Sequence, residues 1–304
     1  MCGLFGMAGL GVNNVDLDII NDLMIISALR GTDGTGLASG SLYRNGTIYK
    51  NTGDPYYWRW GCADKHLEDK IFNVVNSYFI GHCRKRTTGD AGQKGAQPFC
   101  GETIIGTHNG MIGWKFEPFH TDSAKLIGLL EAKKDIQLVV NETEASDAIA
   151  LVWINRKDKT LNFYKNSRRP LYFAFNEKRS VLYWASELEM LALALRRNGV
   201  EYDPYYCKDN FHYSVKIEDI GTRKKIKAFT SKEITQPKAP EPAKVIHIGG
   251  KKQHPKDDKV IGETLEELKQ IPWMRDNKGT STPPWEGPET FDEYDEETRE
   301  RLLH

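Results

Sequence analysis

The sequence predicts an α+β fold of layered sheets and helices over residues 2–234, followed by a mostly disordered tail over residues 235–304. Three observations support this prediction. Short apolar segments of strand length, separated by turn-rich connections, dominate the first part of the chain. The few segments with helical spacing stand between blocks of strands, which favours antiparallel sheets over a repeated strand–helix–strand unit. Beyond about residue 235, eight of the 13 prolines and long charged stretches replace the aliphatic positions.

The apolar pattern places the elements along the chain. A buried strand at Gly3–Gly9 is followed by a helix at Asp16–Leu29, in which Leu17, Ile20 and Met24 share one face. The next two strands flank an Asn-Gly turn and form a predicted hairpin. These two strands are Thr35–Leu42 and Thr47–Asn51. The remaining strands are expected at Ser77–His82, Thr103–His108, Ala148–Asn155, Leu161–Asn166, Leu171–Phe175 and Val181–Ala185. The remaining helices are expected at Ser123–Ala132 and Glu187–Arg197.

The predicted tail contains one segment with helical spacing, residues 261–271. Ile261, Leu265 and Leu268 fall on one face of this segment, and Pro272 ends it. The end of the tail is acidic with a few aromatic residues. Such runs are most often solvated, and the alternative is a docking motif for a partner protein.

The composition disfavours several classes of protein. Forty-two acidic residues balance 42 basic ones, which argues against polyphosphate or nucleic-acid binding as the main function. No apolar run approaches the roughly 18 residues of a membrane span. The N-terminus lacks the features of a signal peptide, so a cytoplasmic protein is expected. The five cysteines form no CxxC pair and fit reduced thiols: Cys2, Cys62, Cys83, Cys100 and Cys207.

Cys2 is the residue most informative about function. Removal of the initiator methionine would leave its thiol and a free α-amino group on the same residue. An α-amine has a pKa of about 7.7–8.0, so it can act as an uncharged base near neutral pH without large tuning. Activation by the N-terminal amine is known for Thr, and Cys is intrinsically more nucleophilic. A second-position cysteine is most often incidental, so Cys2 on its own is weak evidence for a nucleophile.

Six short motifs occur in order along the first part of the chain. They are CGLFG at residues 2–6, RGTDGTG at 30–36, GHCRKRTTG at 81–89, GAQPF at 95–99, THNGMI at 107–112 and TDS at 121–123. In order and spacing they resemble the glutaminase domain of class II glutamine amidotransferases, and the resemblance extends over about residues 2–230. It implies a four-layer αββα sandwich of the N-terminal nucleophile hydrolase type, with no metal or organic cofactor at the site.

The resemblance also implies a role for individual residues. Cys2 would be the nucleophile that attacks the side-chain amide of glutamine. The side-chain amide of Asn109 and the backbone N–H of Gly110 would hold the tetrahedral oxyanion as two neutral donors. Arg84 would bind the substrate α-carboxylate, for which its planar fork is suited, and Asp122 would accept the α-ammonium.

Thr87 and Arg30 complete the expected substrate pocket. Thr87 lies in the loop that would line it, and Arg30 would pack beside the nucleophile. Taken singly, Arg84 could be an ordinary surface arginine and Asp122 a helix N-cap. Placed within the ordered motifs, the two charges suit the two ends of an amino-acid zwitterion.

Other residues with reactive side chains receive no chemical role. His82 and His108 stand at strand ends, where most histidines are hydrogen-bonded core residues. Cys83 and Cys100 are interpreted as small buried hydrophobic residues.

The chain departs from the family pattern in several positions. Leu29 stands where relatives often have His, and Lys85 replaces a common aromatic residue, with Arg86 after it. These two basic side chains are either solvated or in contact with an anionic co-substrate or partner protein. The changes leave the expected nucleophile, oxyanion hole and zwitterion-binding pair in place.

The resemblance implies a complete reaction. The Cys2 amine would take the thiol proton during attack on glutamine, and a γ-glutamyl thioester would form and be hydrolysed to glutamate as ammonia is released. Family members usually carry a second domain that consumes the ammonia, and the tail lacks the apolar content for one. We therefore expect a separate acceptor enzyme, docked by the tail helix around Leu265 and Leu268 or by the basic region Lys216–Lys227.

Two alternative functions stay open at this stage. One is a catalytically silent glutamine-sensing or scaffolding module with the same fold. The other is an amidohydrolase for a different amide. A scaffold would have no physical need for a nucleophile, two oxyanion donors and a zwitterion-binding pair together, and the pair disfavours a substrate that is not an amino acid.

Overall fold

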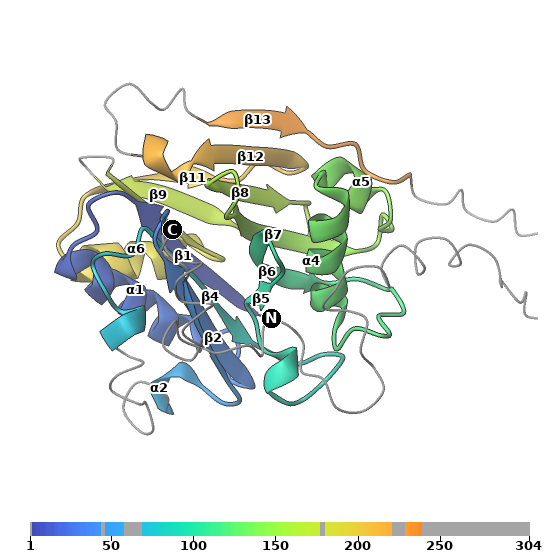
Figure 1. Cartoon of the computed structure of the whole chain (residues 1–304), viewed down its shortest axis with the longest axis horizontal. Helices are drawn as coiled ribbons and strands as arrows, with labels where there is room; N and C mark the ends of the chain where they lie inside the picture. Colours follow the sequence, from blue (N-terminus) through green and yellow to red (C-terminus); the bar gives the residue numbers. More distant parts are fainter. Residues whose placement is uncertain (1, 44–45, 58–68, 177–179, 221–228, 239–304) are drawn as a thin grey trace, which may run out of the picture.

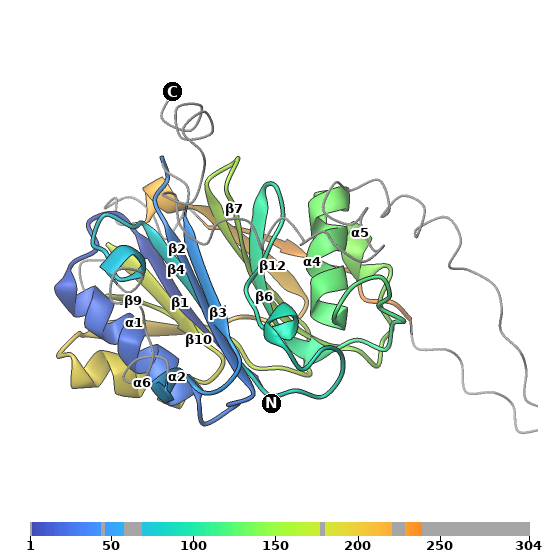
Figure 2. The same ribbon diagram turned by 60° about the horizontal axis from the view of Figure 1, so that its bottom comes forward.

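The computed structural model describes residues 2–43, 46–57, 69–176, 180–220 and 229–238. Within these residues two antiparallel sheets stack face to face, and helices cover the outer face of each sheet. This arrangement is the predicted αββα sandwich, with the four layers seen side by side in Figure 2. The prediction of the fold class is therefore confirmed.

The first sheet has seven strands in the order β11-β9-β10-β1-β4-β2-β3. Every neighbouring pair is antiparallel. The strands are β1 (Gly3–Gly9), β2 (Gly34–Gly40), β3 (Thr47–Asn51), β4 (Tyr78–Arg84), β9 (Tyr172–Asn176), β10 (Val181–Ala185) and β11 (Tyr202–Tyr206). The helices on this side are α1 (Asn14–Ser27), the short α2 (Pro55–Tyr57) and α6 (Leu188–Arg197), as Figure 1 shows.

The second sheet has six strands in the order β13-β12-β8-β7-β6-β5. They are β5 (Phe99–Cys100), β6 (Ile104–Met111), β7 (Ala148–Asn155), β8 (Thr160–Lys165), β12 (Phe211–Lys216) and β13 (Thr230–Glu233). Its outer face carries α4 (Asp122–Lys133) and α5 (Ile136–Val140). Two 3₁₀ turns, η2 (Gln93–Gly95) and η3 (Ile217–Asp219), lie in the connections.

Three apolar cores hold the layers together. One lies between α1, α6 and the seven-stranded sheet, one between the two sheets, and one between the six-stranded sheet and α4 and α5. Burial of this apolar surface is the main force that stabilises such a stack. The central strands of both sheets are buried on both faces. Their sequences are therefore nearly continuous apolar runs.

Strand β1 occupies the middle of the seven-stranded sheet and serves two cores. Phe5 packs in the core beneath the helices, and Leu4 packs in the core between the sheets. Gly6 lies on the Leu4 face, where a Cβ would stand 2.2 Å from the Trp184 ring, so only glycine fits. This packing fixes the strand that directly follows Cys2.

The start of α1 shows why the sequence folds into a helix there. The side chain of Asn13 accepts hydrogen bonds from the backbone N–H groups of Val15 and Asp16, and the Asp16 carboxylate accepts from the Asn13 N–H at 2.8 Å. This reciprocal capping box satisfies donors that the first helical turn leaves free. The helix begins two residues earlier than the apolar spacing predicted.

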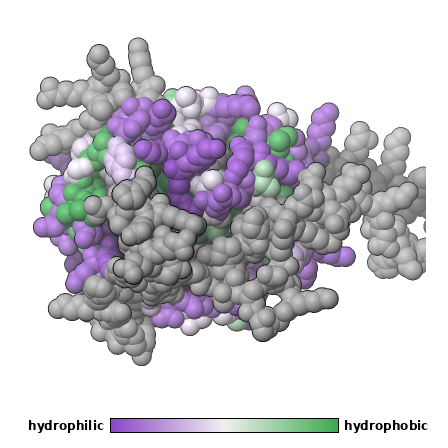
Figure 3. All heavy atoms as spheres, viewed as in Figure 1, coloured by the Kyte–Doolittle hydropathy of each residue, from purple (hydrophilic) through white to green (hydrophobic). Residues whose placement is uncertain are grey.

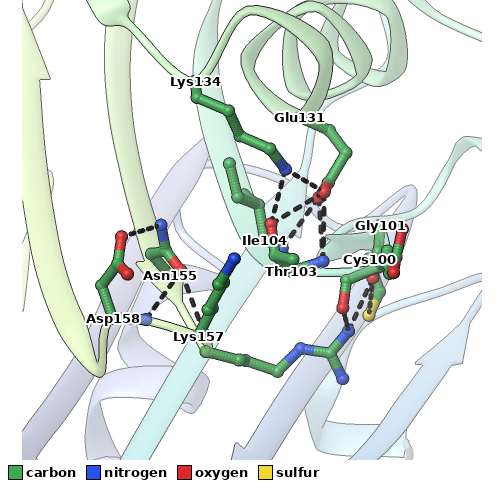
Figure 4. A network of polar contacts seen from close by, with 11 residues as sticks. Cys100, Gly101, Thr103, Ile104, Glu131, Lys134, Asn155, Lys157 and Asp158 are labelled. Carbon is green, nitrogen blue, oxygen red and sulfur yellow. Dashed lines mark hydrogen bonds and ion pairs between the residues drawn. The ribbon is translucent and has the colours of Figure 1, made fainter.

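A polar network ties the end of α4 to the strand below it. The Glu131 side chain is 6% exposed and accepts hydrogen bonds from the backbone N–H groups of Thr103 and Ile104, from the Thr103 hydroxyl and from Lys134 Nζ (Figure 4). Hydrogen bonds to a charged group are stronger than neutral ones. The network fixes α4 against the first residues of β6, whose later residues enter the candidate site.

The strands and helices predicted up to residue 197 are all present, with ends shifted by at most three residues. The sequence did not predict the short helices α2 and α5 or the strands β5, β11, β12 and β13. Asp122 is the first residue of α4 rather than its N-cap, because the Thr121 hydroxyl accepts from the Ala124 N–H and takes that role.

Some predictions fall outside the described residues. These are the hairpin turn at 44–45, Cys62, part of the basic region and the tail helix at 261–271. The proposed boundary at residue 235 stays a prediction, although the chain keeps contacts with the domain just beyond it. Thr235 exchanges two hydrogen bonds with Gln137, and the Gln236 amide donates to the Tyr164 hydroxyl.

Where Figure 3 colours the surface of the described residues, that surface is mostly hydrophilic. In the part of the chain that the structure describes, no helix is long and apolar enough to cross a membrane.

Candidate active site

The Cys2 thiol lies against the backbone at the end of β4. Gly3 pairs with Cys83 across β1 and β4, so the residue before β1 meets the residues after β4. The Lys85 N–H points to Cys2 Sγ at 3.3 Å, and the thiol lies 3.4 Å from the Lys85 carbonyl oxygen. The same backbone segment carries Arg84, the expected carboxylate-binding residue.

Arg30 and Glu187 fix the backbone of Cys2 from the other side. Arg30 Nε donates to the Cys2 carbonyl at 2.7 Å, and its Nη1 forms an ion pair with the Glu187 carboxylate. The buried hydroxyl of Ser186 accepts from the Leu4 N–H at 2.8 Å. Arg30 therefore lies beside Cys2, and its role in a substrate pocket stays a prediction. Ser186 and Glu187 received no role from the sequence.

The Cys2 thiol is protonated at neutral pH in this environment. Burial raises its pKa above the ordinary value of 9.0, and the Lys85 N–H and the charges of Arg84 and Arg30 only partly oppose this effect. A neutral thiol is a weak nucleophile, so attack requires a base that removes the proton.

Asn109 presents an unused donor in the interior. The residue lies near the end of β6 and is 1% exposed. Its Nδ2 is buried and has no hydrogen-bond acceptor among the described residues. Leaving such a donor unpaired costs about 1–3 kcal/mol, which is unusual unless the donor has a functional partner.

Gly110 stands where the backbone is crowded. A Cβ at this position would lie 1.8 Å from the Ala148 carbonyl oxygen and 2.4 Å from His108 Nε2. Only glycine allows this close approach between β6 and β7. Strand β6 contacts both β1 and β4 across the sandwich, so Asn109 and Gly110 belong to the strand that faces the one that follows Cys2.

Gln97 links the two sheets directly beside this position. Its amide donates to the His108 carbonyl at 2.9 Å, and its side-chain oxygen accepts from the His108 N–H at 2.7 Å. The backbone of Gln97 packs on β2, where a Cβ at Gly36 would lie 2.0 Å from its carbonyl oxygen. Gln97 thus holds the residue before Asn109 in place. Gln97 belongs to the GAQPF motif, but no role could be assigned to it from the motif alone.

The two expected zwitterion-binding residues already have backbone partners. Arg84 is 6% exposed, and its guanidinium donates to the carbonyl oxygens of Asp90 and Thr88. Asp122 is 7% exposed and accepts from the Ile112 and Ser123 N–H groups, each at 2.9 Å. The Asp122 charge acts on Arg84, so the two residues lie within electrostatic reach of each other. In this form they hold the loop and the helix start, and their role toward a substrate stays a prediction.

The loop after Arg84 is exposed. Thr87 lies on its surface. Lys85 and Arg86 both engage Asp33, through a Lys85 Nζ contact at 3.4 Å and an Arg86 N–H bond at 2.8 Å to the same carboxylate oxygen. The backbone of Arg86 and the charge of Lys85 keep the pKa of Asp33 below its ordinary value. The side chain of Leu29 is 86% exposed.

The histidines and buried cysteines are structural. Burial lowers the pKa of His82 to about 3, so its ring is neutral. The His108 ring contacts the Ser123 hydroxyl at 2.9 Å. Cys83 is fully buried as predicted, whereas Cys100 is only half-buried at the edge of the inter-sheet core, a correction that follows from its place on the short edge strand β5. Among the described residues, no cluster of three or more metal-binding side chains is present.

Solved structures share this fold. One is the glutamine phosphoribosylpyrophosphate (PRPP) amidotransferase from B. subtilis complexed with ADP and GMP, and another is the allosteric regulatory enzyme of purine biosynthesis. Each is 17% identical to this chain, superposes with a TM-score of 0.57, and matches 78% of this chain and 50% of its own. The chain therefore spans about half the length of these structures, and the likeness shows the fold. No family model matches the chain, and no curated protein sequence matches it.

Proposed function

We propose that this chain hydrolyses the side-chain amide of glutamine through Cys2. The observation that carries the proposal is the combination of a half-buried thiol with a raised pKa, directly before β1, and the unpaired donor of Asn109 on the facing sheet. An amide carbonyl between them would place its carbon at the sulfur and its oxygen at the donors. The motifs that resemble the glutaminase domain and the solved structures with this fold support the choice of glutamine.

The proposed first half of the reaction forms a thioester. After removal of Met1, the free α-amine of Cys2 takes the thiol proton while sulfur bonds to the amide carbon. The carbonyl electron pair moves to oxygen, where Asn109 and the Gly110 N–H stabilise the negative charge. When the carbonyl reforms, the C–N bond breaks, the ammonium returns its proton to the leaving nitrogen, and ammonia departs.

The second half regenerates the enzyme. Water gives a proton to the α-amine and attacks the thioester carbon, and the same donors stabilise the second oxyanion. Cleavage of the C–S bond releases glutamate, and the sulfur recovers its proton. The two half-reactions consume one glutamine and one water and yield one glutamate and one ammonia. In this scheme Arg84 binds the substrate α-carboxylate, Asp122 binds its α-ammonium, and Thr87 lines the pocket.

The test uses purified protein with a defined N-terminus. We expect glutamate release from the chain that begins at Cys2, and none from Cys2→Ser or from a chain with an N-terminal extension. Cys100→Ser is the matched control, because it removes a half-buried thiol outside the site. Equal turnover by the extended chain would refute the amine-as-base mechanism, and activity in Cys2→Ser would refute the nucleophile.

We further propose that the ammonia passes to an acceptor enzyme on a separate chain. The support is the predicted docking segment in the tail. A truncation that tests it should keep residues up to 238, because Ile234 is buried and Thr235 and Gln236 bond to the domain. In extract of the producing cells, free ammonia per glutamate should fall below one for the full chain and return to one after truncation. A ratio of one for both would overturn the proposal.

A further inference from the structure

A second polar site adjoins the candidate active site where the chain crosses between the sheets. The crossing loop, residues 166–171, leaves the end of β8 and enters the start of β9. Lys165 at the end of β8 pairs with Ala150, the β7 residue that also pairs with Asn109. The loop therefore starts at the same end of the six-stranded sheet as the predicted oxyanion donors.

The loop ends near the residues that hold Cys2. Tyr172 at the start of β9 pairs with Ala185, the residue before Ser186 and Glu187. Those two residues bond to the backbone of Leu4 and to Arg30, respectively. Only strand β10 separates the end of the loop from β1, which directly follows Cys2. The loop therefore connects the sheet that carries Asn109 with the sheet that follows Cys2.

The loop forms one wall of a cavity of about 370 Å³. This volume falls within the range of small-molecule sites, toward its lower end. The residues that line the cavity are Ser167, Arg168, Arg169, Pro170, Tyr172 and Tyr206. We call it the Arg168–Arg169 pocket.

Among the described residues, the pocket lining carries two positive charges and no carboxylate. Arg169 Nη1 donates to the Arg168 carbonyl at 2.8 Å, and its Nε is buried with no acceptor among the described residues. The neighbouring carboxylate of Asp209 is already ion-paired with the fully buried Lys165 and bonded to the Tyr206 hydroxyl at 3.1 Å. Two arginines in one wall therefore remain to attract an anion.

The two tyrosines form an aromatic corner of the pocket. The Tyr172 and Tyr206 rings lie 5.1 Å apart at an angle of 53°. The Tyr206 hydroxyl is fixed by Lys165 Nζ at 2.6 Å, which holds the ring against the pocket. Such a corner suits the carbon skeleton of a small molecule, while planar guanidinium groups suit bidentate binding of carboxylate or phosphate.

The positive charge of Arg169 acts on two residues of the candidate site, Arg30 and His108. Burial lowers the pKa of the Arg30 guanidinium, and the charge of Arg169 lowers it further. The charge of Arg169 likewise acts on His108, the neighbour of Asn109. An anion bound at Arg169 would reduce this positive potential at the residues that surround Cys2.

We propose that the Arg168–Arg169 pocket binds a small organic anion that carries a phosphate or a carboxylate. Its charged group contacts Arg168 and Arg169, and the rest of the molecule lies against Tyr172 and Tyr206. The pocket belongs to the same domain as Cys2 but contains none of the residues proposed for glutamine hydrolysis. Binding there is independent of that activity and is measured without glutamine.

The experiment is calorimetric titration of the full chain with three probes: inorganic phosphate, ribose 5-phosphate and succinate. We expect at least one to bind, and the pattern distinguishes phosphate from carboxylate recognition. Arg168→Gln and Arg169→Gln should each raise the Kd about tenfold or more, since a charge-assisted contact contributes about 1.5–3 kcal/mol and 1.4 kcal/mol corresponds to tenfold.

The matched control is Arg196→Gln, which removes the same charge from an exposed position in the last turn of α6. Its Kd should equal that of the unaltered chain. Should Arg169→Gln fail to fold, the exposed Arg168 provides the second variant. The proposal is overturned if none of the three probes binds, or if Arg196→Gln weakens binding as much as Arg168→Gln does.

Discussion

Replacement of Asn109 by Ala separates catalysis from stability. The Nδ2 group makes no hydrogen bond to any described residue, so the substitution breaks no bond of that donor in the resting protein. In the proposed reaction the same donor meets the developing oxyanion. Loss of one such donor costs about 2.7–4 kcal/mol of transition-state stabilisation, which corresponds to roughly 100- to 1,000-fold in kcat.

The matched control is Asn166→Ala, another buried asparagine with the opposite bonding pattern. Its side chain accepts from the N–H groups of Ile149 and Arg168 and donates to the Asp147 carbonyl at 2.7 Å. At about 0.5–1.5 kcal/mol for each bond, plus the cost of backbone groups left unpaired, its removal should destabilise the fold by about 2–4 kcal/mol.

The assay measures glutamate release and urea unfolding on both variants. Asn109→Ala should lose activity while its free energy of unfolding changes by less than about 1 kcal/mol, and Asn166→Ala should lose mainly stability. Unchanged kcat in Asn109→Ala would remove this residue from the oxyanion hole. A loss of stability as large as that of Asn166→Ala would show that its role is structural.

Three further predictions follow from the packing and the pKa shifts. Gly31→Ala would place a Cβ 2.3 Å from the Arg84 carbonyl carbon and should lower glutaminase activity by displacing the backbone beside Cys2, with kcat as the readout. Burial alone would raise the pKa of Glu131, but bonds from Lys134 and Thr103 outweigh it and keep the pKa below 4.5. The stability from Glu131 is thus full above that pH and lost as pH falls through the folded-state pKa. Glu131→Gln should therefore cost about 1–3 kcal/mol at pH 7 and less in acid, as urea titrations at both pH values would show. Iodoacetamide should label Cys2 in the native protein and Cys83 only after unfolding, because burial raises the pKa of Cys83 and closes access to it; mass spectrometry of the peptides checks this order.

The central strands could be predicted because their own residues determine them. Both faces of β7 and β10 are buried, so each is a continuous apolar run whose ends coincide with the observed ones. The strands that were not predicted are β5, β11 and β13, which lie at sheet edges, and β12, which lies between β8 and the edge strand β13. All four residues of β13 are exposed, and β11 contains Pro204, which is tolerated only at an edge. Their pairing comes from neighbouring strands and leaves little pattern in the sequence.

The candidate site shows the same division. Cys2, Asn109 and Gly110 stand in motifs that could be found by order and spacing. The contacts that position them could not, because they join segments far apart in the chain. The Leu4 N–H reaches Ser186 across 182 positions, and Arg30 reaches Glu187 across 157. A motif can show that a residue belongs to the candidate site. Its contact partner becomes visible only when the fold brings distant segments together.

The charges around Cys2 explain why its α-amine would be essential. Two arginines lie near the thiol, and free guanidinium groups there would favour a thiolate at rest. Arg30 is instead neutralised by Glu187, and Arg84 donates to backbone carbonyls. Burial therefore prevails and the thiol keeps its proton. With neutral donors at Asn109 and Gly110, negative charge gains its main stabilisation only once a substrate oxygen is present. In the proposed reaction a base on the same residue removes the proton during attack, so the thiol is a weak nucleophile until that base acts.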